Sequence, residues 1–152
     1  MSEALKIAII GDYNFTFNAH HATNLSLDHS SEFLDVELNY YWIKISEALK
    51  HKEGYFNQYD GIWIAPGPIE NPFYLNGIFK KIANKNIPVL ITGEGFKIFL
   101  EYLITQNQLL SQQEKLISEN LISGSSFERI TIEPRSKTFH QLYENFNNVE
   151  LS

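Results

Sequence analysis

The chain has 152 residues, enough for one domain with a hydrophobic core. Its formal net charge is −6 and its lysines and arginines are few and scattered, which argues against nucleic-acid binding because that function needs a basic surface. No apolar run approaches the roughly 20 residues of a membrane span, and the sequence contains no cysteine for disulfides, thiolate metal sites or thiol catalysis. We expect a single cytoplasmic domain over residues 1–152 that binds neither membrane nor nucleic acid.

The first half of the chain alternates between strand and helix patterns. Residues 5–10 form a short apolar run ending at Gly11, which is typical of a strand buried on both faces. Residues 16–34 follow with a helical pattern, and residues 36–42 alternate as a second strand. A short helix is expected around residues 47–51. The stripe expected to be buried on the first helix consists of Ala22, Leu25, Ser26, His29 and Phe33.

The second half continues the alternation. Residues 62–65 predict a third strand, and the apolar spacing of residues 75–82 predicts a helix. Residues 87–92 predict a fourth strand, and residues 96–104 predict an amphipathic helix with apolar positions at Phe96, Phe99, Leu100, Leu103 and Ile104. Strands that alternate with helices indicate an α/β fold. We therefore expect a doubly wound, mostly parallel sheet with helices on both faces.

The C-terminal region is more polar. Residues 107–119 predict a solvated helix or connector, and two short strands at residues 120–123 and 127–132 predict a small antiparallel hairpin. An aromatic-rich set surrounds the second strand, and we attribute most of it to core and sheet-edge packing. An exposed excess would instead indicate a partner surface. The set comprises Tyr40, Tyr41, Trp42, Tyr55, Phe56 and Tyr59.

Three turns follow the predicted strands and are the expected location of a functional site. They lie at residues 11–14, 66–68 and 93–95. Ligands of open parallel sheets bind outside the C-terminal ends of the strands, because loops from neighbouring strands meet there. The glycines of these turns also have a purely structural explanation, since they let the chain reverse over the sheet edge.

In order and spacing, these turns resemble class I glutamine amidotransferases, specifically the C-terminal amidotransferase region of CTP synthase and its short stand-alone relatives. The matching stretches are residues 7–14 with 19–22, then 59–67, and then 86–96. The resemblance covers roughly residues 5–105. It implies the amidotransferase fold, together with an ancestral glutaminase chemistry.

The same resemblance implies that this chemistry is missing. The family needs a cysteine on a sharp strand-to-helix turn, with a glycine two positions later. If Gly95 is that glycine, the nucleophile position is Gly93, and Glu94 follows it with an unusual acidic side chain. The family's late His-Pro-Glu is absent too, because the last histidine, His140, is followed by Gln141-Leu142. We expect no glutaminase activity.

A vestigial ligand pocket is the site expected at these turns, without a cofactor. His20 matches a histidine of the stand-alone relatives and has either a pocket role or a capping role, whereas His29 is expected in the core or at an interface. Asp12, His20 and Glu94 could in principle hold a metal, but their spacing does not support one. The expected pocket residues are Asp12, Tyr13, Asn14, His20, Gly67, Pro68, Gly93, Glu94 and Gly95.

Three functions remain open from the sequence. The first is a non-catalytic amidotransferase-like domain that acts in small-molecule binding, regulation or protein interaction. The second is a repurposed enzyme on a small amine or nucleotide-like substrate, with Asp12, His20 and Glu94 as acid–base groups, which requires these side chains to converge. The third is a structural subunit that forms a homodimer through its aromatic surface.

Overall fold

The structure, a computed structural model, describes residues 4–109, 128–130 and 149–151. The chain divides into two compact units, residues 1–115 and 116–152, and each is described here by itself. The single domain expected from the sequence stays a prediction. Within the described ranges, no helix is both long enough and apolar enough to cross a lipid bilayer.

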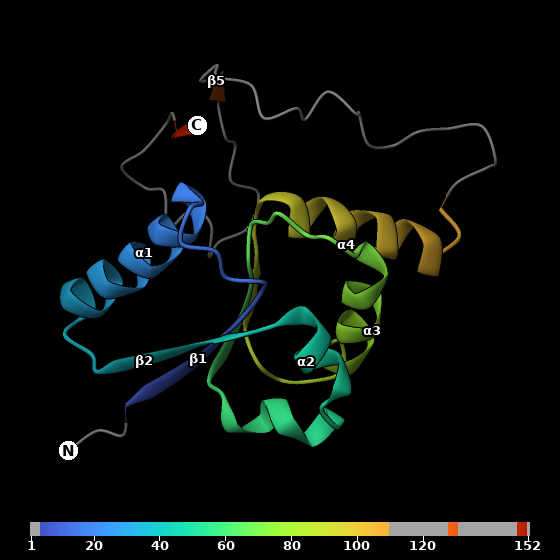
Figure 1. Cartoon of the computed structure of the whole chain (residues 1–152), viewed down its shortest axis with the longest axis horizontal. Coiled ribbons are helices and arrows are strands. Elements are labelled where there is room, and N and C mark those ends of the chain that lie inside the picture. Colours follow the sequence, from blue (N-terminus) through green and yellow to red (C-terminus); the bar gives the residue numbers. More distant parts are fainter. Residues whose placement is uncertain (1–3, 110–127, 131–148, 152) are drawn as a thin grey trace, which may run out of the picture. The chain divides into compact units, whose positions relative to one another are not determined.

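A four-stranded parallel sheet forms the centre of the first unit (Figure 1). Its strands are β1 (Leu5–Ile10), β2 (Leu38–Ile43), β3 (Gly61–Ile64) and β4 (Val89–Ile91), in the order β2-β1-β3-β4. Along the sheet, the chain passes from β1 to β2 toward one edge and from β3 to β4 toward the other edge. The predicted α/β fold with a parallel sheet is confirmed, and the switch in direction lies between β1 and β3.

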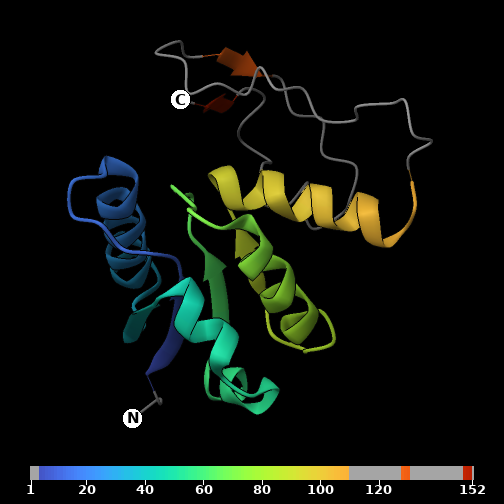
Figure 2. The ribbon, with the colours of Figure 1, turned by 45° about the vertical axis from the view of Figure 1, so that its right-hand side comes forward.

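Helices cover both faces of this sheet. α1 (Asn18–Leu34) connects β1 to β2, and α3 (Pro72–Ile82) connects β3 to β4. The two helices lie on opposite faces of the sheet (Figure 2), as expected for right-handed crossovers that run in opposite directions. α4 (Gly93–Gln106) and α2 (Ile45–Lys50) both pack against α3. A 3₁₀ helix, η1 (Glu53–Gln58), leads from α2 toward β3.

The main core lies between the sheet and α3. The apolar positions predicted for this helix, Leu75, Ile78, Phe79 and Ile82, are all buried, against the sheet residues Ile10, Ile62 and Ile64 among others. On α4 the prediction was less accurate. Phe99 packs against the core, but Phe96 is 48% exposed, and the buried positions are Gly95 and Ile98.

The stripe predicted to be buried on α1 is wrong. His29 and Phe33 are exposed, and the buried residues are His20 and Thr23. The inner face of α1 is polar because it supplies hydrogen-bond acceptors to the aromatic side chains of β2. Asn24 Oδ1 accepts from Trp42 Nε1 at 2.8 Å. Burial, together with a hydrogen bond to Asp28 on α1, raises the pKa of Tyr40 above its ordinary value.

Aromatic side chains between β2 and β3 pack largely as expected. Phe56 is fully buried, and the hydroxyl groups of Tyr55 and Tyr59 lie 3.2 Å apart. Burial first, and this hydrogen bond second, raise the pKa of Tyr59 far above the ordinary tyrosine value. Tyr41 packs edge-on against Tyr59 but is 48% exposed.

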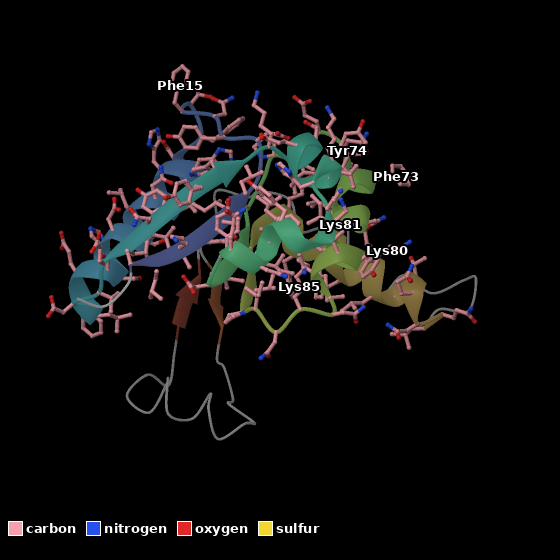
Figure 3. All side chains as sticks on the ribbon, turned by 90° about the horizontal axis from the view of Figure 1, so that it is seen from below. Phe15, Phe73, Tyr74, Lys80, Lys81 and Lys85 are labelled. Atoms are coloured by element: carbon pink, nitrogen blue, oxygen red, sulfur yellow. The ribbon has the colours of Figure 1, made fainter. Side chains whose placement is uncertain are left out.

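A lysine connects α3 to the end of α2. Lys81 donates to the backbone carbonyl oxygen of Leu49 and, at 2.6 Å, to that of His51 (Figure 3). These carbonyls close the last turn of α2, where a cation also complements the helix dipole. The contact fixes α2, and with it the loop that precedes α2, against α3.

The second unit contains a two-stranded antiparallel sheet of β5 (Glu128–Ile130) and β6 (Val149–Leu151). β5 lies inside the predicted strand at residues 127–132. Its partner among the described residues is β6, whereas the other predicted strand, at residues 120–123, lies outside them, so the predicted hairpin stays a prediction. His140 and most of the segment 107–119 also lie outside them.

Candidate functional site

The turn after β1 depends on the close approach of three strands. Gly11 is buried, and a Cβ atom there would lie 2.5 Å from the Cβ of Ala65 and 3.2 Å from the ring of Trp42. Asn14 shapes the next residues, since its Oδ1 accepts from the backbone nitrogen of Thr16 at 2.9 Å. This turn brings the Asn14 backbone N–H toward the inside of the molecule.

His20 joins the first turn to the turn after β3. Its side chain is buried, with Nδ1 2.9 Å from the backbone nitrogen of Asn14 and Nε2 2.6 Å from the carbonyl oxygen of Gly67. A backbone N–H can only donate, so Nδ1 is the acceptor and Nε2–H donates to Gly67. Tyr13 and Trp42 surround the ring. Both ring nitrogens are thus engaged with backbone groups of two different loops, and the pocket or capping role expected for His20 stays a prediction.

The third turn begins at Gly93, which has φ +56° and is the first residue of α4. A Cβ atom on Gly93 would lie 2.5 Å from the carbonyl oxygen of Pro66 and 2.8 Å from its Cα. Gly95 is similarly confined, since a Cβ there would lie 2.8 Å from Ile64 Cγ2. The strained strand-to-helix turn is therefore present, but the backbone of Pro66 fills the space that a side chain at position 93 would need.

Glu94 binds back onto the turn after β3. Its backbone N–H donates to the carbonyl oxygen of Pro66 at 2.7 Å, and its Oε2 accepts from the backbone nitrogen of Ile69 at 2.9 Å. Its carboxylate lies over Gly67, which has φ +110° and precedes a cis peptide bond to Pro68. A Cβ on Gly67 would lie 2.6 Å from Glu94 Oε2. The turn after β3 thus has a negatively charged hydrogen-bond acceptor, which the Glu94 carboxylate supplies.

We call these contacts the turn hub. The hub consists of His20, the turn Pro66–Ile69 and residues 93–95, which are held together by the hydrogen bonds just described. It contains six of the expected pocket residues: His20, Gly67, Pro68, Gly93, Glu94 and Gly95. Asp12 makes no hydrogen bond to His20 or Glu94 within residues 4–109, and the acid–base set of these three groups stays a prediction. No group of metal-ligating side chains is present among the described residues.

A separate crevice lies beside the hub, at the C-terminal ends of β1, β2 and β3. Its volume is about 550 Å³, and it is lined by residues 12–15, by residues 44–46, and by Glu70, Asn71 and Tyr74. Of the expected pocket residues, Asp12, Tyr13 and Asn14 line it. The others belong to the turn hub.

Sequence reasoning missed the remaining lining residues of this crevice. Lys44 directly follows β2, and Glu70 lies in the loop after β3, so the strand-end rule that located the three turns applies to both. The second strand carried no glycine turn at its end, and residues 45–58 had no clear pattern. Tyr74 is on α3, and only its place near the N-terminus of that helix could have indicated it.

Comparison with known proteins finds a likeness at the level of structure. No protein-family model matches the chain, and no curated protein does. The chain is similar in structure to the glutaminase domain of CTP synthase from Trypanosoma brucei, solved with acivicin bound. The TM-score is 0.71 at 15% sequence identity, over 97% of this chain and 65% of that one. The likeness is one of fold. The chain thus spans about two thirds of the length of that glutaminase domain.

Proposed function

We propose that the chain is a non-catalytic domain of glutaminase fold that binds a small molecule in the crevice at the ends of β1, β2 and β3. The observation that carries the proposal is the closed position at Gly93. The Pro66 backbone fills the space of a nucleophile there, and the Glu94 N–H, which the family resemblance assigns to the oxyanion, already donates to Pro66.

The crevice supports a binding role in two ways. It lies beside the β1–β3 switch point, where ligands of open α/β sheets bind. Within residues 4–109, the side chains of Asp12, Lys44 and Glu70 make no hydrogen bond or ion pair. Charged groups that the fold does not use are therefore available to a ligand, and through a bound ligand the domain would act in regulation or interaction.

Ammonia release from glutamine tests the non-catalytic part. We expect no release above the buffer blank from the purified chain, and none from the Gly93→Cys variant, because the added side chain has no room beside Pro66. Release that is proportional to chain concentration and stays with the protein through chromatography would overturn the proposal. Gly93→Cys that becomes active while folded would overturn the closed geometry on which it rests.

Chemical-shift mapping by NMR tests the binding part. A panel of small cationic, neutral and anionic metabolites is titrated into the labelled chain. We expect the shifts caused by any binder to concentrate at residues 12–15, 44–46 and 70–74. Shifts confined to the turn hub, or none with the whole panel, would contradict the assignment of the crevice.

A further inference from the structure

The crevice contains three exposed aromatic rings. Tyr13 and Tyr74 are 42% and 41% exposed, and Phe15 is 75% exposed. Phe15 comes from the loop after β1 and Tyr74 from α3, and both line the crevice. Tyr13 packs on one side against His20 and Trp42, and together with Phe15 and Tyr74 it gives the crevice exposed aromatic surface that a ligand could cover.

The charges of the crevice favour a cation. Asp12 and Glu70 place two carboxylates in its lining, against one ammonium group from Lys44. None of the three is engaged by other side chains within residues 4–109. Lys44 is exposed, and its long, flexible stem lets its ammonium group turn into solvent. The formal net charge of the whole chain, −6, adds to the attraction of cations.

Carboxylates together with aromatic faces form the combination that recognises organic ammonium groups. The carboxylates supply charge, and the faces of tyrosine and phenylalanine attract the cation through their quadrupole. We propose that the crevice binds a small organic ammonium compound, with Asp12 and Glu70 around the charged nitrogen and with Tyr13, Phe15 and Tyr74 against its carbon atoms. This inference rests on the proposed function and names its ligand class.

Matched cationic and neutral probes test the ligand class. The probes are choline and 1,4-diaminobutane, with 3,3-dimethylbutan-1-ol and butane-1,4-diol as their uncharged counterparts. Each is titrated into the labelled full chain at low ionic strength. We expect at least one cation to bind with millimolar or better affinity and to shift the residues of the crevice, and we expect the neutral counterparts not to bind. Loss of cation binding in high salt is expected because the carboxylates are partly in water.

Variants separate the charge and stacking contributions. Asp12→Asn and Glu70→Gln are expected to weaken cation binding by about fivefold each, as the loss of a partly exposed ion pair implies. Tyr74→Leu is expected to weaken it by a similar factor, roughly fivefold. Lys44→Ala is expected to leave it unchanged or stronger. Glu101→Gln, which removes an exposed carboxylate on α4 outside the crevice, is the control and is expected to have no effect.

The outcomes distinguish this inference from the proposed function. If only neutral or anionic molecules of the panel bind the crevice, the binding function stands and the ammonium class is wrong. If the neutral counterparts bind as well as the cations, or if Glu101→Gln weakens binding as much as Asp12→Asn, the assigned charges are wrong. If neither cation shifts the crevice, the ammonium class is wrong too. Ammonia release from glutamine, by contrast, would overturn the proposed function whatever the amines do.

Discussion

A histidine with both ring nitrogens in hydrogen bonds to the backbone acts as a structural connector. His20 supplies an acceptor to the Asn14 N–H and a donor to the Gly67 carbonyl, two groups that lie in different loops. Within residues 4–109, neither the Asn14 N–H nor the Gly67 carbonyl oxygen has another hydrogen-bond partner. The sequence predicted His20 as a site residue but left its role open, because the role depends on which loop comes within reach of Nε2.

Removal of the His20 ring is expected to destabilise the fold. His20→Ala leaves two backbone groups without partners and opens a cavity, so we expect the free energy of unfolding to fall by about 2–4 kcal/mol. The neighbouring His21 provides the control. It is exposed, with one hydrogen bond to the Phe15 carbonyl oxygen and an edge contact with the Tyr13 ring, so His21→Ala should cost less than about 1 kcal/mol. Urea denaturation measures both, and equal losses would contradict the connector role.

Gly93 can be tested against another glycine of the chain. An alanine at position 93 would have to adopt φ +56°, and its Cβ atom would lie 2.5 Å from the carbonyl oxygen of Pro66. Because of this backbone strain and steric clash, Gly93→Ala should lower the free energy of unfolding by at least about 2 kcal/mol. Gly54 has open space around its Cβ position. Gly54→Ala should leave stability unchanged or raise it by up to about 1 kcal/mol. A Gly93→Ala variant as stable as Gly54→Ala would disprove the steric argument.

At the scale of elements, the start of α4 is bound to the loop that precedes α3 through the Glu94 side chain. The Glu94 carboxylate accepts a hydrogen bond from the Ile69 N–H. Because Ile69 is buried, this backbone group needs an acceptor from the protein. Sequence alone identified Glu94 as an acidic residue at a helix N-terminus. It could not show that the carboxylate turns toward the β3 loop, because that depends on the backbone conformation of Gly67 and Pro68.

In a Glu94→Ala variant, a small carboxylate such as formate should restore the lost hydrogen bond to the Ile69 N–H. We expect Glu94→Ala to lose about 1–2 kcal/mol of unfolding free energy, since the Ile69 N–H loses its acceptor. Added formate should raise the midpoint of thermal unfolding of this variant more than that of the parent chain, because it binds the folded state only. Chloride at equal ionic strength and the Glu101→Ala variant serve as controls. An equal effect of formate on all chains would show that the carboxylate position is not specific.

Prediction of the elements succeeded where apolar spacing reflects burial and failed on α1. The α3 positions Leu75 and Ile82 were predicted because apolar residues there face an apolar sheet. On α1 the inner face carries Asn24 and Asp28, which bind Trp42 and Tyr40, so the apolar stripe pointed to the wrong side. Because the buried face of α1 is polar, the apolar periodicity of the sequence followed the exposed face of the helix.

For the whole molecule, the parallel sheet determines which loops meet. The sequence predicted the fold class to which the order β2-β1-β3-β4 belongs, since alternating strands and helices leave few topologies. The three glycine turns gather at one edge of the sheet, as expected. Their division into a hub and a separate crevice could not be predicted. That division arises because the Pro66 backbone lies over Gly93, which is a property of loop conformation and not of residue type.

High pH should destabilise the whole fold through Tyr59. Its pKa is 10.0 when exposed, as in the unfolded chain, and is higher in the folded chain. The folded state therefore keeps a proton that the unfolded state loses. The stabilisation is complete below pH 10 and declines as pH rises from there toward the folded pKa. Tyr59→Phe should show a weaker decline above pH 10 in urea denaturation at several pH values. The same decline in both chains would assign the effect to other groups.

The separation of hub and crevice also bears on how readily such a domain changes its specificity. Asp12, Lys44 and Glu70 hold no part of the fold together within residues 4–109, whereas the hub residues do. Random substitution at the three charged positions should therefore yield mostly folded variants, while substitution at Gly67 or Gly93 should yield few. Ligand preference could then drift during evolution, or be redesigned in a library, without a simultaneous compensating change in the scaffold.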